Sequence, residues 1–240
     1  MSRLDNYLVE HAFVDSRNKA QTIIKEGLVT VNSKVIIKSS YKLASDDVVE
    51  VEEYKQYVSR SAHKLDEFLS ELDLDVSAKV CLDIGSSTGG FTQVLLERGV
   101  KEVSAVDVGR DQLHHSIKKN PRVHSFESCD IRKFESDKTF ELVVSDVSFI
   151  SLLNILDDVD RLAKKDIILL FKPQFEVGRE ASRDNNGVVL DERAIGNAML
   201  KFEDACEQKN WKMIQKSPSQ LTGKEGNLEY CYYFTTRNNK

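Results

Sequence analysis

The sequence has few cysteines, and none of them lie close enough in the chain to form a metal or redox motif. The four are Cys81, Cys129, Cys206 and Cys231, and the five histidines show no ligand spacing either. We therefore expect no metal site. No signal-peptide pattern opens the chain, and reduced thiols are typical of intracellular proteins. These features predict a cytoplasmic protein.

Long apolar runs are also absent. The longest uninterrupted run, residues 167–171, has five residues, whereas a membrane-spanning helix needs about 20. We therefore expect no membrane span. A pore-forming protein would need a membrane-length or strongly amphipathic exposed segment, and the sequence offers neither.

The chain lacks the positive charge of a wholly basic nucleic-acid binder, since its net charge is −5. Residues 16–42 nevertheless carry six basic residues against one acidic residue, Glu26. Such a segment is either a solvated surface or an RNA-binding face, and composition alone does not choose between them.

The pattern of residues 1–53 predicts a small α+β domain of two helices followed by short strands. Ser16 is a suitable N-cap, because its hydroxyl can accept a hydrogen bond from an early helical N–H. Ala20, Ile23 and Ile24 then form an apolar stripe at helical spacing.

The order RLDNYL…SRNKAQTIIKEGLVTVNSKVI resembles an S4 RNA-binding domain. In that family, two helices and the following turn present basic residues to structured RNA. The RNA-binding residues that the resemblance implies are Arg3, Arg17, Lys19, Lys25, Lys34, Lys38 and Lys42.

Residues 54–60 are interpreted as a linker to a larger domain, residues 61–240. The segment is polar and lacks clear periodicity, but Tyr57 and Val58 favour an apolar surface to pack on. We therefore expect an ordered coupler between the domains.

From residue 61 onward, strand-like and helical segments alternate, which is typical of a parallel sheet covered by helices on both faces. The run 147–163 is expected to be a helix, and residues 167–171 a central strand buried on both faces. Two strand-like segments, 211–217 and 228–236, predict an antiparallel finish to the sheet.

The stretch LDIGSSTGGFT, residues 82–92, places a glycine-rich turn between a strand and a helix. Asp107 ends the next strand, 22 residues after Gly85, where doubly wound folds bind ribose hydroxyls. Asp130, after the third strand, could face an adenine edge. The pattern indicates a nucleotide-like cofactor, and the alternative is a tight turn with two surface aspartates. The dinucleotide-binding motif G-x-G-x-x-G is missing, which argues against a nicotinamide-dependent oxidoreductase.

The form D-I-G-x-x-x-G-G resembles the S-adenosylmethionine-dependent methyltransferases of the Rossmann-like class. The resemblance implies an α/β fold with a mostly parallel seven-stranded sheet, and S-adenosylmethionine as cofactor. It places Asp83 near the methionine amino group. The implied cofactor-binding residues are Asp83, Gly85, Ser86, Ser87, Gly89, Gly90, Phe91, Asp107, Asp130 and Asp146.

Four charged residues are expected at one crevice. Asp146 and Lys172 each end a strand, Glu229 begins the last strand, and Lys64 edges the apolar face of a helix. Each has an ordinary explanation by itself, such as a snorkelling lysine, a helix cap or a solvated strand end. Three of them at strand ends beside a shared crevice favour a common role.

The ordered set Lys64, Asp146, Lys172 and Glu229 resembles the Lys-Asp-Lys-Glu tetrad of FtsJ-like ribose 2′-O-methyltransferases. With the S4-like segment, the stretches SRSAHKL, DVSFISL, LLFKPQFEVGR and GKEGNLEY are similar to the TlyA family, the hemolysin-A-type rRNA 2′-O-methyltransferases. The resemblance implies a catalytic tetrad and a ribosomal RNA cytidine as target, within a ribosomal subunit. We expect 23S rRNA, with 16S rRNA as the alternative, and a monomeric enzyme.

The linker departs from that family. Its longer members carry Arg-x-Trp-Val there, where this chain has Lys55-Gln56-Tyr57-Val58. The chain also lacks their terminal extensions. The resemblance to the shorter type implies modification of the large-subunit RNA only.

Two polar loops that contain glycine, residues 176–189 and 217–227, flank the expected site. Their basic residues could hold RNA phosphates, or the loops could be solvent-facing connections without a binding role. The residues concerned, with one from the linker, are Arg60, Arg179, Arg183 and Lys224.

A non-catalytic RNA-binding or ribosome assembly factor is the main alternative from another class. It would need neither the glycine-rich turn nor four charges gathered at a crevice. Replacing Lys172 by alanine would then leave its function unchanged.

Overall fold

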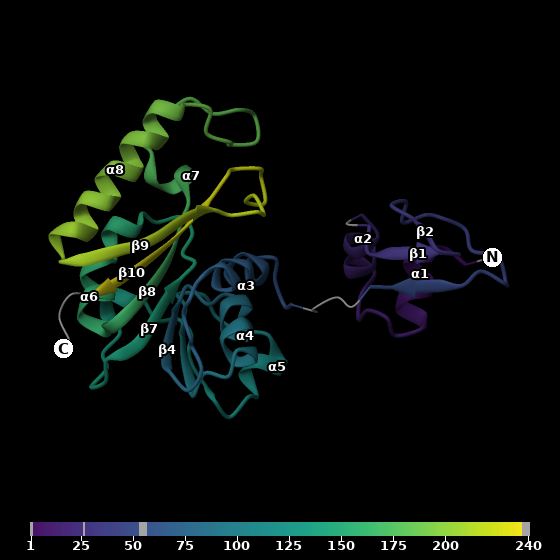
Figure 1. Cartoon of the computed structure of the whole chain (residues 1–240), viewed down its shortest axis with the longest axis horizontal. Coiled ribbons are helices and arrows are strands. Elements are labelled where there is room, and N and C mark those ends of the chain that lie inside the picture. Colours follow the sequence, from purple (N-terminus) through teal and green to yellow (C-terminus); the bar gives the residue numbers. More distant parts are fainter. Residues whose placement is uncertain (1, 26, 53–56, 237–240) are drawn as a thin grey trace. The chain divides into compact units, whose positions relative to one another are not determined.

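The computed structural model describes residues 2–25, 27–52 and 57–236. The chain divides into two compact units, Met1–Gln56 and Tyr57–Lys240 (Figure 1).

The first unit packs two helices against a small antiparallel sheet. Its elements are α1 (Leu4–Glu10), α2 (Arg17–Lys25), β1 (Val29–Val31), β2 (Lys34–Val35) and β3 (Val49–Val51). Among the described residues the strand order is β2-β1-β3. Ser16 Oγ accepts a 3.3 Å hydrogen bond from Lys19 N, as expected of an N-cap. The apolar stripe of α2 is fully buried against Leu4 and Leu8.

The second unit alternates strands and helices around one sheet. Its strands are β4 (Val80–Ile84), β5 (Glu102–Val106), β6 (Val123–Phe126), β7 (Phe140–Ser145), β8 (Ala163–Phe171), β9 (Trp211–Pro218) and β10 (Tyr230–Thr236). Its α-helices are α3 (Ser61–Glu71), α4 (Gly90–Glu97), α5 (His115–Lys118), α6 (Leu156–Leu162), α7 (Pro173–Glu176) and α8 (Glu192–Gln208).

The strand order β6-β5-β4-β7-β8-β10-β9 in the described part of the chain confirms the predicted mostly parallel seven-stranded sheet. The strands β4 to β8 are parallel, and β10 pairs antiparallel with both β8 and β9. The direction of strand succession reverses between β4 and β7. Ligands of open α/β folds bind beyond the strand ends at such a switch point.

Helices cover both faces of the sheet, α3, α4 and α5 on one side and α6 and α8 on the other (Figure 1). The strand β8 explains the longest apolar run of the sequence. Its Ile167, Leu169 and Phe171 pack under α6 and α8, while Ile168 and Leu170 pack under α3 and α4. Because both faces are covered, no position in this run is polar.

The second unit begins earlier than the predicted boundary at residue 61. Tyr57 is only 4% exposed and joins the core under α3 and α4, with its ring 4.8 Å from that of His63. The predicted linker 54–60 therefore overlaps the second unit at residues 57–60, because the tyrosine buries its ring there. Its first residues, 54–56, lie outside the described residues.

Candidate active site

The glycine-rich loop links β4 to α4 and approaches the loop after β7. Gly85 has φ +79°, and a Cβ there would lie 3.1 Å from the main-chain oxygen of Asp146 and from Val147 Cα. Only a glycine accepts both that backbone conformation and that close approach. Gly89, at φ +94°, is the N-cap of α4, and a Cβ there would lie 2.8 Å from Leu113 Cδ1.

A pocket of about 580 Å³ opens at the carboxyl ends of β4, β5, β6 and β7. We call it the glycine-loop pocket. Gly85, Ser87, Asp107, Asp130 and Asp146 line it, all of them predicted cofactor-binding residues. Ser86 and Phe91 line a smaller hollow of about 120 Å³ that also includes Gly85 and Asp146.

Asp107 fixes the glycine-rich loop to the loop after β5. Its carboxylate accepts hydrogen bonds from Ser87 N at 2.8 Å and from Gly109 N at 2.7 Å. Asp130 lines the pocket with its carboxylate in a 2.6 Å ion pair with Arg132, which lines the same pocket. The Arg132 guanidinium also holds the pKa of Asp130 at about 2.

Asp83 lies fully buried at the foot of the same loop. Thr92 Oγ1 donates a 2.6 Å hydrogen bond to its Oδ2, while Oδ1 has no hydrogen-bond partner among the described residues. Burial raises the pKa of Asp83 to about 7. An unsatisfied buried acceptor of this kind is unusual in a native structure, and it fits the binding of a donor group from a ligand.

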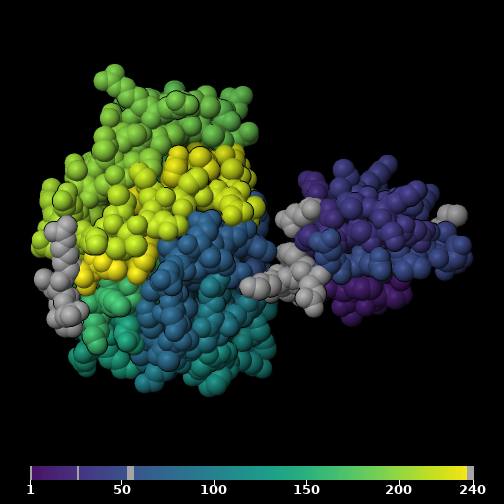
Figure 2. Space-filling model, viewed as in Figure 1, coloured from purple at the N-terminus to yellow at the C-terminus, as the bar shows by residue number. Residues whose placement is uncertain are grey.

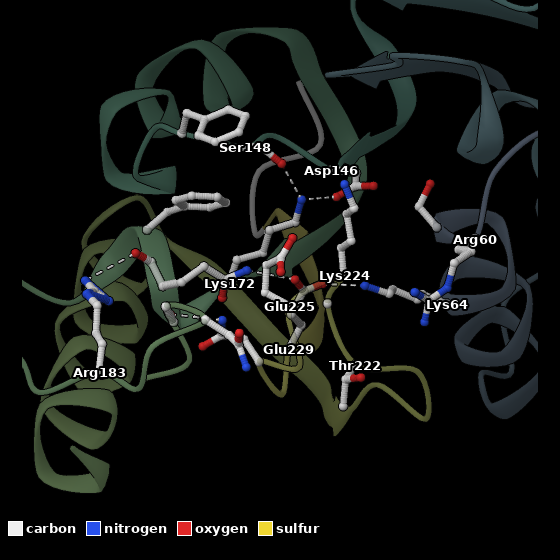
Figure 3. Close-up of a pocket in the computed structure, with 18 residues that line it drawn as sticks. Arg60, Lys64, Asp146, Ser148, Lys172, Arg183, Thr222, Lys224, Glu225 and Glu229 are labelled. Carbon is white, nitrogen blue, oxygen red and sulfur yellow. Dashed lines mark hydrogen bonds and ion pairs between the residues drawn. The ribbon is translucent and has the colours of Figure 1, made fainter. Parts of the chain in front are cut away.

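A second pocket, of about 760 Å³, holds the four charges predicted to meet. We call it the tetrad pocket. Lys172 Nζ lies 2.6 Å from Asp146 Oδ1, and Lys64 Nζ lies 2.5 Å from Glu229 Oε2 (Figure 3). The structure therefore brings all four side chains together, as two ion pairs.

The packing of α3 against β10 joins the ends of the chain's second unit. In Figure 2 the surface of the C-terminal strand pair, in yellow, adjoins that of α3, in blue. Lys64 and Glu229, contributed by these two regions, are 7% and 2% exposed. Paired burial of this kind offsets part of the desolvation cost of each charge.

Ser148 and Gln174 complete the polar contacts of the tetrad. Lys172 Nζ donates to Ser148 Oγ at 2.8 Å, and Gln174 Nε2 donates to Glu229 Oε1 at 2.9 Å. Burial raises the pKa of Asp146, and the Lys172 ammonium opposes that rise. The sequence alone did not indicate Ser148 or Gln174, although both stand two residues after a predicted tetrad member.

The two pockets share a wall made of Asp146, Ser148 and Phe149. Residues 147–151 were expected to be helical, but they form a loop, and α6 begins only at Leu156. Phe149 is 91% exposed at φ +66°, with its ring 5.2 Å from that of Phe175. A helix here would remove this shared wall from the strand end.

The flanking loops form the outer rim of the tetrad pocket. Arg60, Arg183 and Lys224 line the pocket. Arg179 is exposed and is not among the residues that line it. Asn227, 5% exposed, ties the loops together, because its Oδ1 accepts from Val189 N at 2.9 Å. Sequence reasoning missed this residue, since a lone asparagine in a polar loop carries no distinguishing pattern.

The predicted RNA-binding residues of the first unit divide into two groups. Arg3 and Arg17 converge on one carboxylate, that of Asp5. Lys19 pairs with Asp15 at 2.9 Å. The remaining members are exposed, namely Lys25, Lys34, Lys38 and Lys42.

No helix in residues 2–25, 27–52 or 57–236 is both long and apolar enough to cross a bilayer. The same residues contain no group of three or more His, Cys, Asp or Glu side chains arranged to hold a metal ion.

The sheet and its crevice have the architecture of the Rossmann-like class I methyltransferases. Two family models match the chain, an FtsJ-like methyltransferase over residues 57–236 and an S4 domain over residues 2–49. These matches correspond to the second and first units described above.

Similar proteins match over nearly the whole chain. The 23S rRNA (cytidine-2′-O)-methyltransferase TlyA of Campylobacter jejuni is 44% identical, over 91% of this chain and 94% of that protein. The 16S/23S rRNA (cytidine-2′-O)-methyltransferase TlyA of Mycobacterium tuberculosis is 34% identical, over 100% and 91%. A solved structure from Streptococcus thermophilus, named a hemolysin, is 30% identical with a TM-score of 0.73, covering 98% of this chain and 88% of that one. The chain belongs to the TlyA family of FtsJ-like methyltransferases with an S4 domain.

Proposed function

We propose that this protein transfers a methyl group from S-adenosylmethionine to the ribose 2′-hydroxyl of a cytidine in ribosomal RNA. The observation that carries the proposal is the wall of Asp146, Ser148 and Phe149 shared by the two pockets. A methyl donor in the glycine-loop pocket and a ribose in the tetrad pocket would meet at that wall. Such alignment is a large part of catalysis when two reactants must approach in line.

The residues present fit the cofactor. Asp83 Oδ1, which has no hydrogen-bond partner in the described part of the chain, would accept a hydrogen bond from the methionine amino group. Gly85 leaves space for close approach to the backbone, and the Asp107 carboxylate lies where ribose hydroxyls bind in doubly wound folds. When bound, S-adenosylmethionine supplies an electrophilic methyl group on a positively charged sulfur.

Lys172 would act on the hydroxyl that is methylated. A ribose hydroxyl is a weak nucleophile while it keeps its proton. Lys172 Nζ, held by Asp146 and Ser148, would orient the oxygen. The hydroxyl proton would pass through Lys172 Nζ to the Asp146 carboxylate as the methyl carbon leaves sulfur and bonds to the oxygen. The Lys64–Glu229 pair would form the other side of the pocket. Gln174 fixes the Glu229 carboxylate there through a hydrogen bond to Oε1.

The RNA target is proposed from the relatives and the S4 domain. The relatives named above act on 23S rRNA or on both 16S and 23S rRNA, and we propose 23S rRNA within the large subunit as the target here. Arg60, Arg183 and Lys224, on the rim of the tetrad pocket, would contact RNA phosphates.

The experiment is methyl transfer from labelled S-adenosylmethionine to ribosomal subunits from cells that lack the enzyme. We expect label in large-subunit RNA, and digestion to nucleosides should place it on a cytidine ribose. Label in small-subunit RNA as well would widen the target without changing the reaction. Label on a base, or no label in either subunit, would overturn the 2′-O assignment.

Gly223→Ala should lower kcat by roughly 10- to 100-fold, since displacements of about 1 Å cost that much in aligned reactions. A Cβ at Gly223 would lie 2.6 Å from Glu229 Oε1, so the carboxylate that Lys64 and Gln174 contact must shift. Steady-state methyl transfer measures the effect. Gly196→Ala is the control, because among the described residues nothing beyond its chain neighbours and the backbone of its own helix lies within 4 Å of a Cβ there. Equal activity of the two variants would contradict the proposed role of Glu229.

The affinity for S-adenosylmethionine should increase as pH rises from about 5.5 to about 7. The pKa of Asp83, raised to about 7 by burial, keeps this acid protonated over much of that range. A cationic amino group favours the carboxylate, so binding would release a proton, and Kd should fall by up to about tenfold per pH unit below the pKa. Calorimetric titration at several pH values measures this. Asp83→Asn should remove the dependence, and an unchanged pH profile in that variant would refute the contact.

A further inference from the structure

The first unit contains a buried carboxylate that the proposed reaction does not use. Asp5, in the first turn of α1, has 0% of its surface exposed. Arg3 donates to it from Nε and Nη2, each at 2.9 Å, and Arg17 donates from Nε at 3.0 Å. Gln21 Nε2 adds a bond of 3.2 Å to the same Oδ2 that Arg17 contacts.

These donors compensate the burial of the charge. An isolated carboxylate away from water is strongly unfavourable, but one that accepts several charge-assisted bonds remains ionised. The Arg3 guanidinium, followed by the bonds from Gln21 and Arg17, holds the pKa of Asp5 well below its usual range. The carboxylate is therefore a permanent negative charge beneath two arginines.

The two arginines still face solvent in part. Their side chains are 41% and 54% exposed, whereas the carboxylate that holds them is completely buried. Arg17 reaches Asp5 through Nε, so the described contacts leave its two terminal amino groups as donors. The exposed Lys42 forms an antiparallel β-bridge with Arg3, so a third positively charged residue lies beside the two arginines.

Tethering of this kind prepares a guanidinium for binding. A free arginine side chain loses rotamer entropy when it is fixed, and part of that loss is already incurred when it is tethered. The planar group also presents its remaining donors in a defined direction, which suits a phosphate oxygen pair.

We propose that Asp5 is a positioning residue, which fixes the guanidinium groups of Arg3 and Arg17 so that together they bind the phosphodiester backbone of a folded RNA. The inference rests on the proposed function, because it assumes that the first unit binds RNA. It adds a role for an acidic residue within a basic surface.

Long-range electrostatics alone predicts the opposite effect. Removing a negative charge from a basic surface strengthens its attraction for RNA, since the net positive charge increases. Positioning predicts weaker binding, because the arginines lose the acceptor that orients them. The sign of the change in affinity after Asp5→Asn therefore separates the two accounts.

The test measures binding of the full chain to large ribosomal subunits at several salt concentrations. We expect Asp5→Asn to weaken binding by about fivefold or more and to reduce the salt dependence, since fewer phosphates would be neutralised. Asp15→Asn is the matched control, because Asp15 is 58% exposed and pairs with Lys19 in the same unit. It should bind as tightly as the wild type or slightly more tightly. Asp5→Asn behaving like Asp15→Asn would overturn the proposal.

Two further variants separate positioning from loss of folding. Arg17→Lys keeps the charge at an exposed site but removes the guanidinium fork, and we expect binding to weaken several-fold. Unchanged affinity in this variant would also overturn the proposal. In an Arg3→Gln/Arg17→Gln background, adding Asp5→Asn should cause no further loss, whereas an additive loss would indicate an independent structural effect.

The outcomes also distinguish this inference from the proposed function. If the wild type methylates and binds subunits while Asp5→Asn binds equally well, only the role of Asp5 fails. If the wild type binds no ribosomal subunit, the RNA assignment of the first unit fails with it.

Discussion

Lys172→Ala should lower the rate of methyl transfer by about 10²-fold or more, the usual range for loss of a group that handles the reacting proton. Lys172 Nζ is the atom that joins Asp146 and Ser148 at the wall shared by the two pockets. Its removal would leave the hydroxyl without its orienting group, while the glycine-loop pocket remains intact. We therefore expect kcat to fall with little change in the affinity for S-adenosylmethionine.

Lys165→Ala is the matched control for this experiment. Lys165 stands on the same strand, β8, but at its opposite end, and it is exposed. It should retain wild-type kcat. A Lys172→Ala enzyme with wild-type activity would exclude the proposed role and would favour a non-catalytic RNA-binding protein.

Lys64→Met should destabilise the second unit by about 3–5 kcal/mol, the cost of leaving one member of a buried pair uncompensated. The partner, Glu229, has a side chain that is only 3% exposed and loses a 2.5 Å contact. The double variant Lys64→Met/Glu229→Met should recover most of the stability, because no unpaired charge remains. It should nevertheless stay inactive, since the tetrad has lost two of its four charges.

Urea unfolding followed by Trp211 fluorescence measures this effect. Trp211, 2% exposed, is the only tryptophan in the sequence and lies in the second unit, so it reports on that unit. Lys138→Met is the control, because Lys138 is 69% exposed in its pair with Glu102. Surface pairs contribute about 0–1 kcal/mol. Equal losses from the two substitutions would show that burial of the Lys64–Glu229 pair contributes little.

The sheet was predictable because its signals are local. Residues 167–171 are continuously apolar, and both faces of β8 are covered. The glycines at 85 and 89 adopt positive φ, as a tight strand–helix turn requires. The positions of Asp146 and Lys172 followed from their places at strand ends, since parallel strands bring their carboxyl ends to one edge.

The remaining features depend on tertiary contacts that sequence patterns do not encode. The run after Asp146 has helical periodicity, yet Phe149 takes φ +66° in a loop that separates the pockets. Asp130 lines the glycine-loop pocket, but its ion pair with the neighbouring Arg132 has no distinguishing sequence pattern. No sequence pattern distinguishes Asp5, because its burial and its contact with Arg17 form only when α1 and α2 pack together.

The central claim is that the tetrad pocket directs a methyl group to a ribose 2′-oxygen. Alkaline hydrolysis of the labelled ribosomal RNA tests it directly, because a 2′-O-methyl group blocks cleavage of the adjacent phosphodiester. We expect the wild type to yield label in an alkali-resistant dinucleotide that begins with cytidine, and Lys172→Ala to yield none. Label released entirely as mononucleotides would contradict it.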